Sequence, residues 1–309
     1  MTVRERREAL EQQILSPYAC RSVDSRGRQR PVEPCPVRTC FQRDIDRIIH
    51  SKAFRRLMHK TQVFLQPEGD HYRTRMTHTI EVARIARTMA RGLQLNEDLT
   101  EAAAFGHDLG HTPFGHVGEQ ALQEICGHFE HNEQSVRIVE KLEKEGQGLN
   151  LTRDVRDGML NHCGKLKAHT LEGALIKYAD RIAYLCHDYE DAETMGLIGP
   201  EDLPEEVKRK IGITHSSMIT AMVTSVVKNS MQSEEDGIHM SKEGDEILAL
   251  FMKFMFDEVY MSKALIPDRK RGSNVVKMLY TYYTEKRPDG SYHETRLPEK
   301  QVRLAEENI

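Results

Sequence analysis

The sequence predicts an all-α fold, and two observations support this. From Phe41 onward, apolar residues recur every three or four positions, as Ile45, Ile48 and Ile49 do, which is the spacing of a helix that buries one side. Helix start signals accompany the pattern: Asn96 precedes an acidic first turn, where negative charge favours the positive end of the helix dipole. The expected exception is a hairpin at residues 287–290 (Arg-Pro-Asp-Gly).

The expected elements follow in order along the chain. Residues 1–20 form a charged helix or frayed arm, and residues 21–40 form a loop rich in proline and arginine. A further loop is expected at residues 67–70 (Pro-Glu-Gly-Asp). The helical patterns cover residues 41–57, 76–93, 97–107, 114–126, 131–145, 153–162, 171–195, 215–231, 242–262 and 273–285.

These elements indicate three parts. A chain of 309 residues is long enough for about two domains. We expect an N-terminal arm and basic loop at 1–40, a helical bundle core at 41–200, and a helical C-terminal subdomain packed on that core at 201–309. The division falls at Gly199-Pro200, which interrupts the helical pattern.

Composition excludes several classes of protein. A net charge of −4 and a pI near 6.4 exclude a strongly basic nucleic-acid-binding protein. The six cysteines are scattered, which predicts free thiols rather than a disulfide framework. The charged N-terminus lacks an apolar signal segment, and the most apolar run, Ile247–Phe256, is too short to cross a bilayer. We therefore expect a cytoplasmic protein without a membrane partner.

The segment from His107 to His116 (His-Asp-Leu-Gly-His-Thr-Pro-Phe-Gly-His) is the most informative part of the chain. The adjacent imidazole and carboxylate of His107 and Asp108 can bind one divalent metal. Neighbouring side chains diverge by roughly 100° on a regular helix, so they converge most easily where a helix ends. We expect that end at Gly110, because glycine readily takes the left-handed conformation.

Two distant residues complete the expected metal site. His78 and Asp180 lie in helical patterns with their polar sides facing away from the apolar stripes. Together with His107 and Asp108, they offer two nitrogen and two oxygen ligands. This set suits one Mn, Mg, Fe, Co or Ni ion better than a structural zinc.

A second group of residues can supply acid–base and phosphate chemistry. His116 and Glu119 are three positions apart at a helix start, so the carboxylate can orient and charge the imidazole, as a general acid near pH 7 requires. His111 can bind phosphate or water, and His131 can line the same cavity. The cations expected to contact phosphate are Arg75, Lys177 and Arg181.

The helix at 171–195 has a polar arc that contains Asp180. The arc is either a solvated face opposite a packed one or the wall of a pocket. Because Tyr184 interrupts the arc and the metal site needs Asp180, we favour the pocket wall. The members of the arc are Lys177, Asp180, Tyr184, His187, Asp188 and Asp191.

Two further features each have two interpretations. His162, next to Cys163, can bind a metal, but a histidine that ends a helix is the favoured interpretation. The arginines at 26–30 are expected to lie in a solvated loop, with contact to nucleotide or nucleic acid as the alternative.

Several motifs together resemble a known family. The spacing of His78, His107-Asp108 and Asp180 resembles the HD superfamily of metal-dependent phosphohydrolases. The surrounding sequence is similar to the bacterial deoxynucleoside triphosphate (dNTP) triphosphohydrolases, often called dGTPases. The similar motifs lie at 42–56, 60–64, 69–78, 107–119, 129–135 and 148–152, and the resemblance covers residues 20–200.

The resemblance implies an HD-domain helical bundle with a helical C-terminal extension. It implies hydrolysis of a dNTP of the dGTP type to deoxynucleoside and tripolyphosphate, by attack of water on the α-phosphate. The implied metal ligands are His78, His107, Asp108 and Asp180. The implied proton donor to the 5′-oxygen is His116 with Glu119 behind it, and the implied phosphate contacts are His111, His131, Arg75 and Arg181. Gln62 and Asp188 would hold the 3′-hydroxyl, and Tyr184 would pack on the sugar and exclude a 2′-hydroxyl.

The resemblance also implies a homo-oligomer, tetrameric or hexameric, with a dNTP effector. Single-stranded DNA is a further expected partner. Two alternatives remain. One is another HD phosphohydrolase, such as a nucleotidase or phosphodiesterase, and the other is a dNTP-sensing regulator without turnover. The intact metal ligands and the His116–Glu119 pair argue against the regulator.

Overall fold

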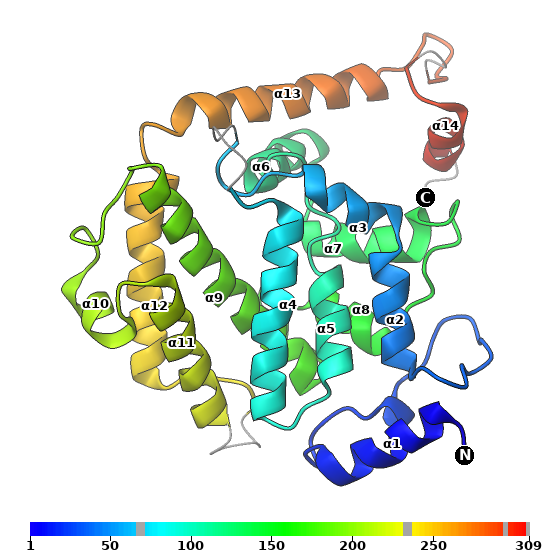
Figure 1. Ribbon diagram of the computed structural model, residues 1–309. Coiled ribbons are helices and arrows are strands. Elements are labelled where there is room, and N and C mark those ends of the chain that lie inside the picture. Colours follow the sequence, from blue (N-terminus) through cyan, green and yellow to red (C-terminus); the bar gives the residue numbers. More distant parts are fainter. Residues whose placement is uncertain (66–71, 231–236, 293–295, 307–309) are drawn as a thin grey trace.

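The molecule is built from helices, as predicted. A computed structural model describes residues 1–65, 72–230, 237–292 and 296–306. These residues contain fourteen α-helices and no β-strand, and their three pairings of extended backbone are isolated bridges (Figure 1). All six cysteines are free, and no described helix is both long and apolar enough to cross a membrane. The loop expected at 67–70 lies outside the described residues.

The helices are α1 (Val3–Ile14), α2 (Cys40–Ile49), α3 (Lys52–Arg56), α4 (Arg75–Gly92), α5 (Glu97–Gly106), α6 (Gly115–Cys126), α7 (His131–Arg137), α8 (Arg153–Leu160), α9 (Leu171–Thr194), α10 (Glu205–Ile211), α11 (His215–Ser230), α12 (Lys242–Phe254), α13 (Ile266–Thr284) and α14 (Glu299–Glu306). Short 3-10 turns lie at Ser22–Asp24 and Leu57–His59.

Several boundaries differ from the prediction. The pattern at 41–57 divides into α2 and α3 because the Ser51 hydroxyl accepts a hydrogen bond from the Phe54 amide at 3.0 Å and so caps a new helix. The patterns at 131–145 and 242–262 end in π-helical turns, η3 (Ile138–Leu142) and η5 (Met255–Tyr260). α13 begins earlier than predicted, and α10 and α14 were not predicted. An antiparallel bridge between Lys286 and Tyr292 confirms the hairpin.

The arginine-rich loop is fastened to the core. The Arg28 side chain is almost fully buried, pairs with the Asp44 carboxylate, and donates to the Asn150 carbonyl at 2.7 Å. The Arg26 guanidinium contacts Asp154 at 2.7 Å. The expectation of a solvated loop is therefore wrong for Arg28, whereas Arg26 is exposed, and both arginines hold the loop against the end of the bundle where α8 begins.

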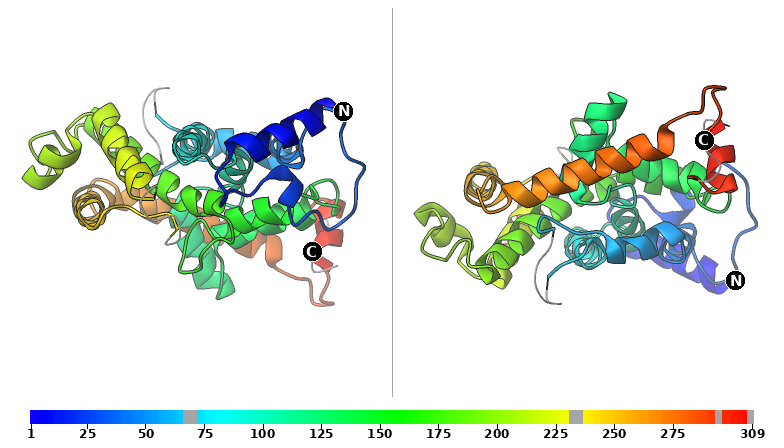
Figure 2. Two further views of the ribbon diagram at one scale, coloured as in Figure 1. Left: turned by 90° about the horizontal axis from the view of Figure 1, so that it is seen from below. Right: turned by 90° about the horizontal axis from the view of Figure 1, so that it is seen from above.

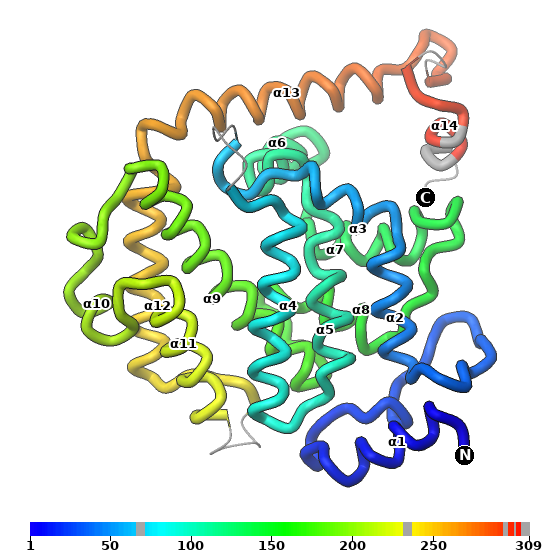
Figure 3. Tube along the Cα trace, viewed as in Figure 1, coloured from blue at the N-terminus to red at the C-terminus, as the bar shows by residue number. Residues whose placement is uncertain are grey.

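α4, α5 and α9 form the centre of the bundle. α4 packs against both α5 and α9, and α5 also packs against α2 and α8 (Figure 1). The views from below and above place α10, α11 and α12 at one end of the molecule and α1 at the other (Figure 2). The chain trace shows α1 and α14 on the same side of the molecule (Figure 3).

Two hydrophobic clusters fill the interior. The larger joins α4 and α9 to the C-terminal helices through residues such as Met89, Leu185 and Phe251. The smaller joins α2, α5 and α8 through residues such as Phe41 and Met159, and it also includes Leu109. The C-terminal helices therefore pack directly on the core, and a domain division near residue 200 stays a prediction.

Candidate metal centre

The four residues predicted to bind metal come together where α4, α5 and α9 meet. His78 lies near the start of α4, Asp180 lies in the middle of α9, and His107 and Asp108 follow the last residue of α5. Three of these side chains, those of His78, His107 and Asp108, are almost completely buried, whereas the Asp180 side chain is 22% exposed. Asp180 is thus the member of the set that reaches toward solvent.

Four separations between the candidate donor atoms, measured to either oxygen of Asp108, match those of ligands around one divalent cation. His78 Nε2 lies 3.1 Å from Asp180 Oδ1 and 3.9 Å from Asp108 Oδ2. His107 Nε2 lies 3.4 Å from Asp108 Oδ1 and 3.7 Å from Asp180 Oδ1. Ligand atoms about 2.1 Å from a six-coordinate ion lie roughly 3.0 Å apart when adjacent and roughly 4.2 Å apart when opposite. All four separations fall within that interval.

The ring nitrogens of His107 also fit a bound cation. Nδ1 donates to the Ala104 carbonyl at 2.6 Å, which leaves the lone pair on Nε2. That buried Nε2 has no hydrogen-bond partner among the described residues. A buried nitrogen of this kind is costly unless an ion or water binds it, and a backbone carbonyl behind the ring is the usual support of a metal-binding histidine.

The turn after α5 has a different cause from the one predicted. α5 ends at Gly106, and Gly110 is not in the left-handed conformation. A Cβ on Gly110 would lie 2.2 Å from the Ser135 amide nitrogen and 2.3 Å from the His131 carbonyl oxygen. Glycine is therefore required because the turn that carries the metal ligands lies directly against α7.

Positive charge surrounds the buried carboxylate of Asp108. Burial alone would raise the pKa of Asp108, but His107 and Arg75 outweigh burial and hold that pKa well below its usual value. Arg75 donates from Nη1 to Asp108 at 2.8 Å, and its buried Nε has no partner among the described residues. Arg75 therefore orients the carboxylate of a candidate metal ligand.

A chain of hydrogen bonds runs beside the metal centre through Glu119. One carboxylate oxygen of Glu119 accepts from His116 Nδ1 at 2.9 Å. The other accepts from the amide and the ring Nδ1 of His131, at 2.8 and 2.9 Å. His131 Nε2 in turn lies 3.1 Å from His162 Nε2. The His116 side chain, at the open end of the chain, is 75% exposed and can reach a substrate.

The hydrogen-bond partners fix the protonation of His131. The Met159 carbonyl, 2.7 Å from His162 Nδ1, can only accept, so the His162 hydrogen is on Nδ1 and its Nε2 is a bare acceptor. His131 must therefore donate from Nε2 as well as from Nδ1. Although burial opposes it, contacts with Cys163 and Glu119 raise the pKa of His131 to about 10. Burial and nearby positive charge lower the pKa of His162 to about 4. Both ring nitrogens of His131 therefore have hydrogen-bond partners, which favours its charged form.

His111 is neutral, in contrast to His131. Burial, followed by the charge of Arg75, holds the pKa of His111 well below its usual value. Its ring stacks on that of His131 with centroids 4.2 Å apart, and its Nε2 lies 3.7 Å from Asp108 Oδ1. This position allows His111 to form a hydrogen bond with water or phosphate next to the cation site.

The polar arc of α9 is enclosed rather than solvated. His187, Asp188 and Asp191 are each less than a tenth exposed. The Tyr260 hydroxyl, from η5, donates to Asp188 Oδ2 at 2.7 Å, and burial raises the pKa of Asp188 to about 6. The burial of these three side chains argues against a solvated face, and the pocket wall stays a prediction.

The remaining predicted residues lie on α9 or in the segment before α4. Gln62 is buried and follows Thr61, whose backbone bridges to Thr74 just before α4. Arg181 and Tyr184 are partly exposed on α9, within one turn of Asp180. Lys177, predicted to contact phosphate, instead donates from Nζ to the Gly164 carbonyl at 2.8 Å.

Four residues of the site were not predicted. His162, interpreted as a helix end, lies against His107 with ring centroids 5.0 Å apart, and its only sequence signal was the neighbouring cysteine. His187 lies 6.0 Å from the His78 ring, although the polar arc gave it no role. Lys60 donates from Nζ to the Leu109 carbonyl at 3.1 Å, beside the ligand turn. Tyr260 comes from beyond residue 200, where no local pattern pointed to the site.

The bundle and its ligands define the class of protein. The family model described as HD domain matches residues 75–185, and this range contains all four candidate ligands. The chain therefore contains an HD domain, a class whose members depend on a metal.

Relatives define the family more narrowly. A protein of Caldanaerobacter subterraneus subsp. tengcongensis is 52% identical over 99% of this chain and 88% of the relative. Proteins of Desulfatibacillum aliphaticivorans and Clostridium perfringens (strain SM101) are 47% and 45% identical, each over 92% of this chain, and over 84% and 85% of the relative. All three are named deoxyguanosinetriphosphate triphosphohydrolase-like protein, and this chain belongs to their family.

Proposed function

We propose that this protein hydrolyses dNTPs of the dGTP type to the deoxynucleoside and tripolyphosphate. The observation that carries the proposal is the oriented His116–Glu119 pair beside a set of two histidines and two aspartates with the spacing of metal ligands. The names of the relatives, which refer to hydrolysis of deoxyguanosine triphosphate, support the substrate class.

One divalent cation, Mn, Mg, Fe, Co or Ni, would be held by His78, His107, Asp108 and Asp180. When bound, such an ion polarises a phosphoryl oxygen and lowers the pKa of water. Arg75 fixes the Asp108 carboxylate for this role. The neutral His111 offers a hydrogen bond to water at the same place.

The chain's own residues handle the protons and the phosphate charge. A bond forms between the water oxygen and the α-phosphorus, and the bond from that phosphorus to the 5′-oxygen breaks, so the 5′-oxygen needs a proton. His116 can donate it from Nε2, because Glu119 holds Nδ1 and the ring is exposed. The charge on the phosphate oxygens would be met by the His131 imidazolium, Arg75 and Arg181.

The sugar would lie along α9. Asp188 and Gln62 would bind the 3′-hydroxyl, and Tyr184 would pack on the ring and exclude a 2′-hydroxyl. The hydrogen bond from Tyr260 supports this arrangement, because it holds the buried Asp188 side chain in one orientation.

Phosphorus NMR of the products tests the reaction. With Mn²⁺ and each of the four dNTPs, singly and in pairs, we expect tripolyphosphate. Orthophosphate or pyrophosphate would instead indicate a nucleotidase or another HD phosphohydrolase. The Asp180→Asn variant should lose both bound Mn²⁺ and turnover, whereas Asp257→Asn, at a surface position paired with Lys253, should keep both. Unchanged Mn²⁺ binding by Asp180→Asn would contradict the ligand set.

Assembly and regulation stay proposals. We propose a cytoplasmic homotetramer or homohexamer with a dNTP effector, and single-stranded DNA stays a predicted further partner. Exposed apolar side chains on α13, including Met278 at 72% and Leu279 at 49%, support contact between copies. Sedimentation velocity tests the assembly, and a monomer at micromolar concentration would contradict it.

A further inference from the structure

One group of described residues with the spacing of metal ligands includes a thiol. It consists of His131, which begins α7, and of His162 and Cys163, which follow α8. One ring nitrogen of each histidine and the sulfur of Cys163 all lie within 4.8 Å of one another. The other such groups among the described residues consist of histidines and carboxylates. This trio therefore offers a softer set of donors than the candidate metal centre does.

The two imidazoles are arranged in the way that metal-binding histidines are. Their Nε2 atoms face each other at 3.1 Å. The Glu119 carboxylate accepts a hydrogen bond from Nδ1 of His131 at 2.9 Å. The Met159 carbonyl accepts one from Nδ1 of His162 at 2.7 Å. An acceptor behind the ring orients a metal-binding histidine and makes its other nitrogen a stronger ligand. Two nitrogens bound to a tetrahedral zinc lie roughly 3.3 Å apart, which is close to the separation of the two Nε2 atoms.

The end of α8 brings the cysteine to the imidazoles. Adjacent side chains diverge by roughly 100° on a regular helix, but α8 ends at Leu160, so His162 and Cys163 can turn toward one point. Gly164, with a φ of +75°, bends the chain directly after them. Lys177 of α9 donates to the Gly164 carbonyl at 2.8 Å and holds this bend. The three donors therefore lie on a fixed turn, at the same kind of helix end that carries the candidate metal centre.

The trio can be reached from solvent on one side. The side chain of His131 is 12% exposed, and His162 is buried. Cys163 is partly exposed, and residues 164–167 after it are exposed. An ion can therefore enter past the cysteine, and water can fill the fourth position of a tetrahedral ion that has three protein ligands.

We propose that His131, His162 and Cys163 bind a second divalent cation, of the thiophilic kind such as Zn²⁺, beside the candidate metal centre. Thiolate and imidazole are ligands that zinc prefers, whereas carboxylates suit harder ions. On binding, Nε2 of His131 and the thiol each lose a proton to solvent, and the cation replaces the hydrogen bond between the two rings. The ion would link α7 to the turn after α8, and its binding does not depend on the proposed reaction.

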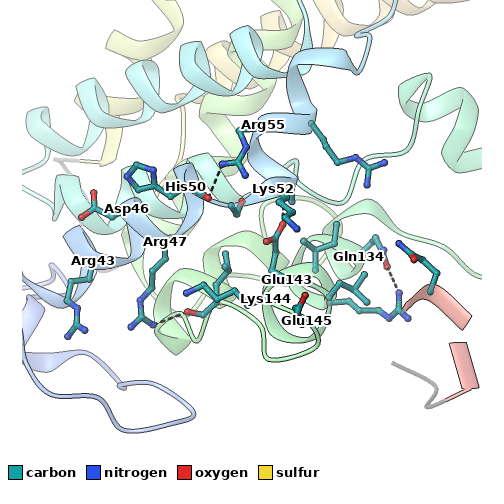
Figure 4. Close-up of a pocket in the computed structure, with 18 of the residues that line it drawn as sticks. Arg43, Asp46, Arg47, His50, Lys52, Arg55, Gln134, Glu143, Lys144 and Glu145 are labelled. Atoms are coloured by element: carbon teal, nitrogen blue, oxygen red, sulfur yellow. Dashed lines mark hydrogen bonds between the residues drawn. The ribbon is translucent and has the colours of Figure 1, made fainter. Parts of the chain in front are cut away.

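The large cavity between α2, α3 and the segment from α7 to Leu149 provides a contrast (Figure 4). Its volume is about 1030 Å³, and its described lining contains one histidine, His50, and no cysteine. It therefore lacks the donors for a thiophilic cation. His50 is exposed there and serves as a control position.

Absorption spectroscopy of the full-length protein with Co²⁺ tests the proposal. Cobalt bound to a thiolate gives a sulfur-to-metal charge-transfer band in the near ultraviolet, whereas cobalt bound only to nitrogen and oxygen does not. We expect this band in the parent and its loss when Zn²⁺ displaces Co²⁺. Cys163→Ser should abolish the band, and Cys126→Ser, at an exposed thiol, should keep it.

The histidine is tested in the same way. His162→Gln should weaken the Co²⁺ binding measured from the band about tenfold or more, since loss of even an outer-shell partner of a ligand costs roughly 10- to 100-fold. His50→Gln should change it by less than about threefold. No band in the parent, or the same band in Cys163→Ser, would overturn the proposal.

Thermal unfolding provides a second measurement that is independent of the band. Because an ion that binds the folded state stabilises it, Zn²⁺ should raise the Tm of the parent more than that of Cys163→Ser, whatever the Tm of the variant alone. Equal rises would contradict the site. Asp180→Asn should keep the charge-transfer band although it loses Mn²⁺. A failure of the proposed reaction would therefore leave the cobalt result unchanged.

Discussion

Glu119 determines the state of two histidines at once. Each of its carboxylate oxygens contacts a different imidazole, the exposed His116 and the buried His131. Although burial opposes ionisation, these hydrogen bonds hold the pKa of Glu119 well below its usual value. One carboxylate thus positions the candidate proton donor and favours the charged form of the second imidazole.

Replacing His116 separates catalysis from binding. Because glutamine keeps the size of the side chain but cannot donate an acidic proton, His116→Gln should lower kcat about 100-fold or more and change KM by less than about threefold. Steady-state kinetics with the preferred dNTP measures both. His128→Gln is the matched control, since His128 is also bonded to a glutamate, Glu133 at 2.7 Å, but on the surface. Equal kcat values for the two variants would rule out the role of His116.

The charge on His131 makes stability depend on pH. The pKa of this group is about 10 in the folded protein, above the value of about 6.5 in an unfolded chain. Its contribution to stability is therefore fully present below about pH 6.5 and is lost as the pH rises through about 10. We expect the free energy of urea unfolding to fall by roughly 1–3 kcal/mol between pH 7 and 10. The His131→Gln variant should lack this part of the decline, and a parallel profile would contradict the assignment.

The spacing of apolar residues was enough to predict most of the helices but not all of their limits. It failed where a local interaction overrides periodicity, as the Ser51 cap does between α2 and α3. The four candidate metal ligands could be proposed from the sequence, because His107 and Asp108 are adjacent, His78 and Asp180 lie in helical patterns, and the family resemblance implies the same set. His162 and Tyr260 were not, because only the packing of segments far apart in sequence brings them to the site.

The contact between the ligand turn and α7 can be tested at Gly110. An added Cβ would clash with backbone atoms that cannot move aside, so Gly110→Ala should destabilise the protein by about 3 kcal/mol or more and weaken Mn²⁺ binding. Gly27→Ala is the control, since Gly27 has a φ of +72° but open space around it, and should cost about 1 kcal/mol. Urea unfolding measures both. Similar losses of unfolding free energy in the two variants would show that the backbone of the turn can shift to accommodate the added Cβ.

At the scale of the whole molecule, the C-terminal helices take part in the site. η5 provides the Tyr260 hydroxyl that holds Asp188, and α13 packs on α6, the helix that carries His116 and Glu119. Figure 1 shows α13 lying across α6 at the edge of the bundle. The segment beyond residue 200 therefore supports the candidate active site as well as the core.

Tyr260→Phe tests that connection. Loss of the hydroxyl leaves the buried Asp188 without its hydrogen bond, which should cost about 1–2 kcal/mol of stability and raise KM about three- to tenfold with a smaller effect on kcat. Tyr283→Phe, at a position 40% exposed on α13, should change neither. An unchanged KM in Tyr260→Phe would contradict a role of Asp188 in binding the substrate.

The position of the candidate cation site between the two hydrophobic clusters has a mechanical consequence. His78 and Asp180 extend from helices of the larger cluster, and Leu109, next to Asp108, belongs to the smaller one. A bound ion would link the two clusters, which α5 also joins because Ala103 and Ala104 belong to the larger and Leu99 and Ala102 to the smaller. Chelation would then loosen this connection, with faster amide hydrogen exchange at the end of α5 and in the turn after it than within either cluster.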